Sequence, residues 1–273
     1  MTTRIAMRVA YLGDNYHGFQ RQPDVKTVEG IIINVLKDLE IIRNEKEANL
    51  GYSGRTDRGV HALAQVIAFD TENERIALPR VLNKHLPDDI WVWQYAKVDK
   101  GFAPRREAEY REYRYILCVN DNLDISKMRQ ASKNLVGTHD FANFIIKGKD
   151  LNGTIQSMDR IDIRAKGDYI VLDFKARYFQ RCLIRKVVSA LVCVGKGEKD
   201  EERLIALLDP EKTKVSVEPA PAVGLILIDV EYPKLNFTEE LYSKESMLKS
   251  LMTSFHQFGT KAEALKSMIE RFS

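Results

Sequence analysis

The stretch Gly51-Tyr52-Ser53-Gly54-Arg55-Thr56-Asp57-Arg58-Gly59-Val60-His61-Ala62 sets one carboxylate among two arginines and a histidine, in a loop punctuated by glycines. Glycines on both sides permit tight turns that other residues resist. The cations of Arg55 and Arg58 favour the ionised form of Asp57. The apolar run 63–69 that follows predicts a strand, so we expect a sheet to hold this loop. Taken alone, residues 54–57 are also consistent with a polar turn and a surface ion pair.

The bulk composition is that of a soluble globular protein. The chain has 273 residues, enough for two domains, with 44% hydrophobic and 30% charged residues. No apolar run approaches the ~20 residues that cross a bilayer, and the N-terminus lacks the pattern of a signal peptide. Cys118, Cys182 and Cys193 lie far apart in apolar segments, which predicts reduced core residues of a cytoplasmic protein. No Cys/His cluster has metal-ligand spacing, so we expect no metal site.

The order of strand and helix patterns predicts an α+β protein. Apolar and polar residues alternate over 4–12, as in a half-buried strand, and apolar residues recur at helical spacing from Thr27, which is placed to cap that helix. Further strands are expected at 63–69, 90–98, 110–119, 157–165, 169–177 and 223–230, and helices at 78–86, 124–135 and 181–194. We therefore expect two similar antiparallel-sheet domains with helices on one face, over residues 1–106 and 107–233. The charged helical pattern of 234–273 predicts a C-terminal helical extension.

Positive charge is concentrated in one segment although the net charge is only +3. Five basic residues and no acidic residue lie between positions 175 and 186, with Tyr178 and Phe179 among them: Lys175, Arg177, Arg181, Arg185 and Lys186. Cations that meet phosphate and rings that stack on bases are typical of RNA-binding surfaces. A solvated helix face explains the charges equally well.

Five further segments occur in a fixed order around the opening loop. They are Tyr11–Gln22, Arg111–Tyr115 (Arg-Glu-Tyr-Arg-Tyr), Gly137–Phe144 (Gly-Thr-His-Asp-Phe-Ala-Asn-Phe), Ile184–Val188 (Ile-Arg-Lys-Val-Val) and Pro219–Leu227 (Pro-Ala-Pro-Ala-Val-Gly-Leu-Ile-Leu). Together with the loop 51–62 they resemble the TruA family of tRNA pseudouridine synthases. Two positions depart from the family pattern: Leu12 replaces the usual Asp, and Arg58 replaces a small residue common in relatives.

The resemblance implies a fold, a reaction and partners. The two antiparallel sheets should join side by side across a basic active-site cleft. The enzyme should be a cytoplasmic homodimer that isomerises uridine to pseudouridine in the anticodon stem-loop of tRNA. The bond from N1 to C1′ breaks and the uracil rejoins through C5, so no redox change occurs and neither metal nor organic cofactor is required. A different RNA target and a catalytically inactive RNA-binding module of the same fold are the alternatives.

The resemblance also assigns catalytic roles. Asp57 is the catalytic residue, acting either as a nucleophile or as a base that removes a ribose proton. Arg185 holds Asp57 in one orientation, with phosphate binding or an exposed helix charge as the alternative. Tyr113 lies against the target base and offers a hydroxyl for proton removal at C5, with ordinary strand packing as the alternative.

The remaining assignments concern substrate binding. The target uridine must leave a helical stem to be reached, and Arg55 is expected to fill the vacated space, to hold phosphate or to shape the loop by an ion pair. Arg58 adds positive charge beside the site. Four further residues are expected to bind substrate: Gln20, His61, Arg181 and Lys186. His61, like His139, is also a candidate for a hydrogen-bonded structural histidine.

Overall fold

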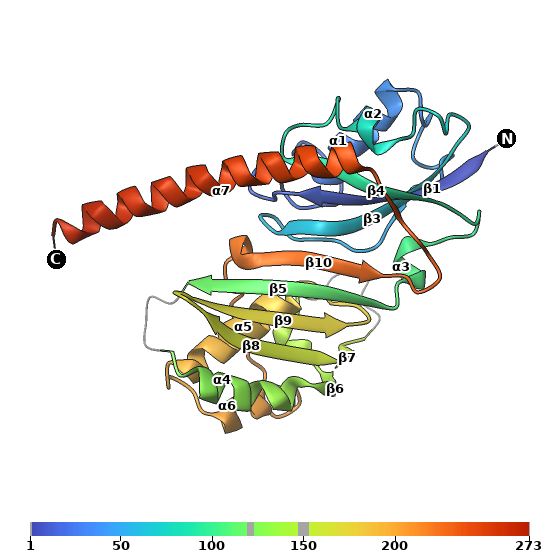
Figure 1. Cartoon of the computed structure of the whole chain (residues 1–273). Coiled ribbons are helices and arrows are strands. Elements are labelled where there is room, and N and C mark those ends of the chain that lie inside the picture. The colour runs from blue at the N-terminus through green and yellow to red at the C-terminus, as the bar shows by residue number, and fades with distance from the viewer. Residues whose placement is uncertain (1, 119–122, 147–152, 273) are drawn as a thin grey trace.

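The computed structural model describes residues 2–118, 123–146 and 153–272, and its centre is one large sheet (Figure 1). Nine strands form it in the order β11-β4-β1-β3-β10-β5-β9-β8, with β2 paired to β3. Their bounds are β1 Thr3–Tyr11, β2 Gly51–Tyr52, β3 His61–Thr71, β4 Ile90–Val98, β5 Tyr110–Cys118, β8 Arg160–Lys166, β9 Tyr169–Ala176, β10 Leu225–Glu231 and β11 Thr238–Glu239. A separate two-stranded sheet pairs β6 (Gly137–Asp140) with β7 (Ile155–Met158).

Strand β10 joins the two halves of the large sheet. It runs parallel to β3, with Ile226 opposite His61, and antiparallel to β5, with Leu227 opposite Tyr113. The other pairings among the described strands are antiparallel. The α+β class is therefore confirmed, and the two expected sheets form one continuous sheet through a short parallel junction. The domain boundaries at 106 and 233 stay predictions.

Seven α-helices accompany the strands in the described part of the chain. They are α1 Val28–Asp38, α2 Pro79–Leu82, α3 Pro104–Glu107, α4 Ile125–Ser132, α5 Leu183–Gly195, α6 Glu201–Ala206 and α7 Leu241–Glu270. The Thr27 hydroxyl caps α1 by accepting a hydrogen bond from the Gly30 amide, as expected. Helix α5 begins two residues later than predicted because Cys182 adopts a left-handed backbone, with φ of 64°.

The first strand is more deeply buried than its sequence alternation suggests. Residues 4–7 of β1 and residues 9–11 are buried on both faces of the sheet, and Arg4 lies among them. Arg4 is tolerated there because Nη1 pairs with Asp70 at 2.8 Å and Nε donates to the Phe102 carbonyl at 2.8 Å. A cysteine expectation also fails: Cys182 is buried, but Cys118, at the end of β5, is exposed.

The C-terminal extension contacts the sheet before it projects. Strand β11, which the sequence pattern did not predict, pairs with β4, and the next element is α7. Met247 of α7 is 3% exposed and packs with Ala10 and Trp91. In the described ranges no helix is long and apolar enough to span a bilayer. The extension is therefore helical as expected, but its first part belongs to the packed body.

We expect Met247→Ala to lower the free energy of unfolding by about 2–4 kcal/mol, because it leaves a cavity against Trp91. Met252, on the same helix, is 53% exposed. The matched control Met252→Ala should change the free energy of unfolding by less than about 0.5 kcal/mol. Urea titrations at one fixed protein concentration measure both. Equal effects of the two substitutions would show that α7 does not pack on the sheet.

Candidate active site

The opening loop connects β2 to β3, and hydrogen bonds fasten its start to the sheet. The Ser53 amide donates to the Val66 carbonyl at 2.8 Å, and Gln65 Nε2 donates to the Gly54 carbonyl at 2.7 Å. The Thr56 hydroxyl shares a 2.7 Å hydrogen bond with the buried Tyr11 hydroxyl. The side chain of Asp57 nevertheless remains 24% exposed. The loop thus presents a carboxylate to solvent from a fixed backbone.

Two glycines of the segment 11–22 let that segment lie directly on the loop. A Cβ on Gly13 would stand 2.2 Å from the Val60 carbonyl oxygen. Gly18 has φ of 91°, and a Cβ there would stand 2.8 Å from the Thr56 carbonyl oxygen. The Phe19 amide donates to that same oxygen at 3.1 Å. The segment 11–22 and the loop 51–62 therefore form one structural unit around Asp57.

The carboxylate of Asp57 meets side chains from the beginning of α5, far away in sequence. Arg185 Nη1 lies 3.4 Å from Oδ2, and the Cys182 thiol donates to the same oxygen at 3.1 Å. Arg185 Nε donates to the Ala220 carbonyl at 2.7 Å, which fixes the plane of the guanidinium. Arg181 Nε lies 3.7 Å from Oδ1. The expected pairing of Asp57 with Arg185 is present in the structure.

The two carboxylate oxygens have different surroundings. Oδ2 is held by Cys182 and by Arg185, whose side chain is only 15% exposed. Oδ1 faces Arg181, whose side chain is 67% exposed and beyond hydrogen-bond distance. The N-terminal end of α5 adds positive potential on this side of the carboxylate. One oxygen is therefore fixed by the protein, and the other is available to a bound molecule.

Tyr113 lies on β5 as a buried residue beside this site. Its side chain packs edge-on against Phe179, with ring centroids 5.2 Å apart. Burial raises the pKa of the Tyr113 phenol; Arg111 opposes this shift and the charge of Asp57 adds to it. The hydroxyl is therefore protonated at neutral pH.

Two residues that were expected to bind substrate instead form hydrogen bonds within the protein. Lys186 is 3% exposed, and its ammonium donates to the Ile145 carbonyl at 3.2 Å and to the Ser216 hydroxyl at 3.0 Å. The prediction that Lys186 meets RNA phosphate is wrong, because α5 turns this side chain into the interior. His61 bridges two backbone groups: Nδ1 accepts from the Gly13 amide at 3.1 Å, and Nε2 lies 3.2 Å from the Val223 carbonyl oxygen. This geometry favours a structural role for His61 over contact with substrate.

The other expected substrate-binding residues lie at or near the surface. Arg55 and Arg58 are exposed on the loop, and Arg55 Nε donates to the Tyr52 hydroxyl at 3.2 Å. Gln20 is half-buried next to the buried Phe19. Asp57 forms ion pairs with Arg181 and Arg185 on the α5 side.

Sequence reasoning missed two residues of the site. Cys182 was expected only as a core cysteine, and its αL backbone and contact with Asp57 have no local sequence signal. Arg111 is 6% exposed and donates to the Ser53 carbonyl at 2.6 Å, to the Arg105 carbonyl at 2.8 Å and to the Arg177 carbonyl. It therefore links the start of the loop to the end of β9. Its place beside Tyr113 in the motif was the available signal.

We expect Cys182 to resist alkylation by iodoacetamide in the folded protein at pH 7.5, whereas Cys118 reacts. Burial and the adjacent charge of Asp57 raise the pKa of the Cys182 thiol to about 11, and only the thiolate reacts. Below that pH the thiol keeps the proton that it donates to Asp57. Peptide mass spectrometry measures labelling at each cysteine, and guanidinium-unfolded protein, in which all three cysteines should label, is the control. Rapid labelling of Cys182 without unfolding would contradict the contact.

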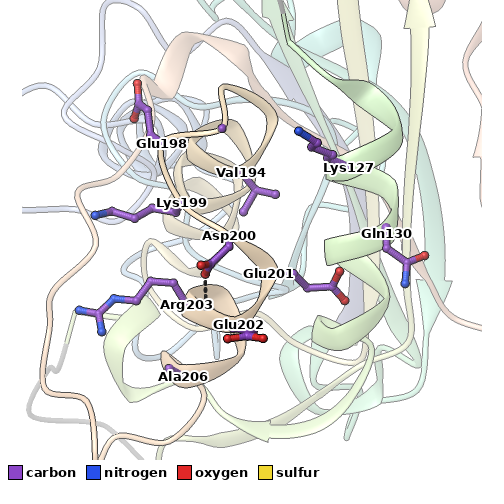
Figure 2. A pocket seen from close by; sticks show the side chains of 11 residues that line it. Lys127, Gln130, Val194, Glu198, Lys199, Asp200, Glu201, Glu202, Arg203 and Ala206 are labelled. Carbon is purple, nitrogen blue, oxygen red and sulfur yellow. Dashed lines mark hydrogen bonds between the residues drawn. The ribbon is translucent and has the colours of Figure 1, made fainter.

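A cavity of about 930 Å³ lies elsewhere, between α4 and the segment 198–206, and Figure 2 shows charged side chains around it. Asp200 there accepts the amide of Arg203 at 2.8 Å and caps α6. None of the predicted site residues lines this cavity. In the part of the chain that the structure describes, no cluster of three or more His, Cys, Asp or Glu side chains is arranged to hold a metal ion.

Comparison with known proteins shows which family this chain resembles. A family model described as tRNA pseudouridine synthase matches residues 7–101 and 131–233. The tRNA pseudouridine synthase A of Methanosarcina mazei is 42% identical over 97% of this chain and 98% of its own length. Its namesake from Methanococcoides burtonii is 47% identical over 88% and 87%, and that from Archaeoglobus fulgidus is 40% identical over 94% of each. With the Asp57 loop and its partners on α5 inside the matched residues, the chain belongs to the tRNA pseudouridine synthase family.

Proposed function

We propose that this protein converts uridine to pseudouridine in tRNA and that Asp57 is its catalytic residue. The observation that carries the proposal is the Asp57 carboxylate, partly exposed on a braced loop and held through Oδ2 by Arg185 and Cys182. Relatives named tRNA pseudouridine synthase A match nearly the whole chain. Target uridines in the anticodon stem-loop and a cytoplasmic homodimer are further parts of the proposal, and they rest on the family resemblance.

The geometry suggests which carboxylate atom reacts. Oδ2 is occupied by donors from α5, so Oδ1 is the atom that meets the nucleotide as nucleophile or as base. The reaction breaks the bond from N1 to C1′ and forms the bond from C5 to C1′. The C5 proton leaves, and N1 takes up a proton, so the electrons balance without an oxidant. Arg185 orients the carboxylate and offsets the cost of keeping it charged beside a base.

In this proposal Tyr113 contacts the uracil base rather than the sugar. Its ring lies beside Asp57, and its phenol keeps its proton because burial raises its pKa. A protonated phenol donates a hydrogen bond to a uracil oxygen, and acting as the base at C5 requires that it first lose this proton to another group. Ring packing against Phe179 holds its orientation.

A target uridine must leave its helical stack to reach Oδ1. Arg55 and Arg58 are exposed beside Asp57, and Arg181 is exposed across from them. These cations are suited to contact the phosphates on either side of an extruded nucleotide. Arg181 is then drawn from Oδ1 toward phosphate, which opens the reactive oxygen.

The substrate is tested by incubating purified protein with unmodified tRNA transcripts and mapping pseudouridine at nucleotide resolution. The proposal expects modification confined to the anticodon stem-loop. Modification of ribosomal RNA fragments but not of tRNA supports the alternative of another target. An inactive RNA-binding module would bind tRNA and modify none of these RNAs, and that result overturns the proposal.

We expect Arg181→Gln to weaken tRNA binding and to lower the salt slope of log K by about one unit, because one phosphate contact is lost. Lys186→Gln, in the first turn of the helix α5 that follows Arg181, is the matched control. It should leave the salt slope unchanged and lower stability, since Lys186 is buried. Filter binding over a range of salt concentrations measures both. An unchanged slope for Arg181→Gln would remove this residue from the RNA interface.

A further inference from the structure

A buried arginine lies at the beginning of β5, beside α3 (Figure 1). Arg111 is 6% exposed, and its hydrogen bonds go to backbone carbonyls. In the part of the chain that the structure describes, no carboxylate pairs with it. Arg4, which is 3% exposed, is instead neutralised by Asp70 at 2.8 Å. Because burying a cation without a counter-charge costs free energy, stability is a weaker reason for Arg111 than for Arg4.

The carbonyls that Arg111 binds belong to the segments that carry the active site. Nη2 donates to the Ser53 carbonyl at 2.6 Å, four residues before Asp57 in the loop. Nη1 donates to the Arg177 carbonyl, at the start of the segment that leads into α5. Nη2 also donates to the Arg105 carbonyl of α3 at 2.8 Å. One planar group therefore ties the catalytic loop to the segment before α5.

Both tied segments are also held on their own sides. The Ser53 amide donates to the Val66 carbonyl at 2.8 Å, which fixes the start of the loop on β3. On the other side, Gln156 of β7 brackets the segment after β9. Its Nε2 donates to the Tyr178 carbonyl at 3.1 Å, and its Oε1 accepts the Gln180 amide at 3.2 Å. Since each segment is braced, the guanidinium between them sets the distance from the loop to α5.

Arg111 also acts on Tyr113, two residues along β5 on the same face of the sheet. Burial raises the pKa of the Tyr113 phenol, the charge of Arg111 opposes this rise, and the charge of Asp57 adds to it. Two roles are thus open to Arg111: a planar fork that fixes positions, or a charge that acts on the phenol. A lysine keeps the charge and lacks the fork, so substitution separates the two roles.

We propose that Arg111 is a positioning residue whose planar fork holds the Asp57 carboxylate in place against the beginning of α5. Five N–H donors in a rigid plane suit a guanidinium to bind three carbonyls at once. Asp57 Oδ2 lies 3.4 Å from Arg185 Nη1 and 3.1 Å from the Cys182 sulfur, and both distances depend on where the loop stands. A misplacement of about 1 Å can lower a rate by about 10²-fold. This role of Arg111 rests on the proposed function.

Alkylation of Cys182 by iodoacetamide reads the position of the loop without an activity assay. Burial and the contact with Asp57 raise the pKa of the Cys182 thiol to about 11, so a displaced loop leaves a more acidic and more reactive thiol. We expect Arg111→Lys and Arg111→Gln each to raise the labelling rate of Cys182 about tenfold relative to that of Cys193. The control Arg4→Lys disturbs a buried ion pair and should leave this ratio unchanged. An unchanged ratio in either Arg111 variant overturns the proposal.

Steady-state kinetics on a tRNA transcript measure the effect on the reaction. We expect Arg111→Lys and Arg111→Gln to lower kcat by about 10²-fold with KM within about threefold of wild type, because the exposed cations that meet tRNA remain. Arg4→Lys should lower the free energy of unfolding in urea and keep kcat, per folded protein, within about threefold. Wild-type kcat in Arg111→Lys would assign the role to charge, and an equal loss in Arg4→Lys would assign it to stability; either result overturns the proposal.

The glutamine variant keeps the test decisive if the lysine variant does not fold. Arg111→Gln removes the cost of burying a charge and still lacks the three-way fork, and circular dichroism confirms that it is folded. Wild-type kcat in Arg111→Gln alone is enough to overturn the proposal. A wild-type protein that forms no pseudouridine would contradict the proposed function, whereas the labelling ratio of Cys182 to Cys193 reports on the fork in either case.

Discussion

Asp57→Asn is expected to lower the rate of pseudouridine formation by at least about 10³-fold, while tRNA binding stays within about threefold of wild type. The amide keeps the shape of the side chain and its place on the loop. It cannot supply the negative oxygen that attacks or removes a proton. Because Asp57 is 24% exposed and pairs with the protein's own Arg181 and Arg185, losing its charge does not remove a contact that tRNA needs.

Single-turnover assays with enzyme in excess measure this effect, with nucleosides separated by chromatography and tRNA affinity measured in parallel. Asp24→Asn is the matched control, since Asp24 is exposed on a turn and has φ of 60°, a conformation that asparagine tolerates. The control should keep the wild-type rate. A variant Asp57→Asn that retains a tenth of the rate would remove Asp57 from the chemistry.

Arg185→Lys is expected to lower kcat by about 10²-fold with KM changed by less than about twofold. Arg185 holds two partners at once: Nε donates to the Ala220 carbonyl at 2.7 Å, and Nη1 meets Asp57 Oδ2 at 3.4 Å. A lysine ammonium keeps the charge but lacks the planar fork that fixes both. Asp57 should then lose its orientation rather than its charge.

The matched control for this prediction is Arg181→Lys, from the same end of α5. Arg181 is 67% exposed and lies 3.7 Å from Oδ1, so a lysine there should leave kcat within about threefold of wild type. Steady-state kinetics on a tRNA transcript separate kcat from KM for both variants. Equal losses in the two variants would show that charge alone matters and that Arg185 does not position the carboxylate.

Local patterns predicted most of the elements, and the exceptions have physical causes. The α1 cap at Thr27 and the hairpin between β8 and β9 follow from neighbours in sequence. The parallel junction of β10 with β3 joins residues more than 160 positions apart, and no local pattern encodes it. Strand β11 has two residues, too few for a periodicity.

The sequence predicted those site residues that lie in recognisable motifs. Asp57 and Arg185 come from separate segments, and the structure brings them together. Lys186 was misjudged because charge alone does not say which side of α5 faces the interior. The contact of Cys182 with Asp57 depends on a left-handed residue at the start of a helix, which favours glycine or asparagine rather than cysteine. Only the assembled backbone reveals such a contact.

The proposed function of this chain is the isomerisation of uridine in tRNA through Asp57. Its most direct measurement is the release of tritium from tRNA that carries [5-³H]uridine, because forming the bond from C5 to C1′ expels the C5 hydrogen. We predict that wild-type protein releases tritium in step with the pseudouridine formed and that Asp57→Ala releases none. Absence of release by the wild type, or undiminished release by Asp57→Ala, would contradict it.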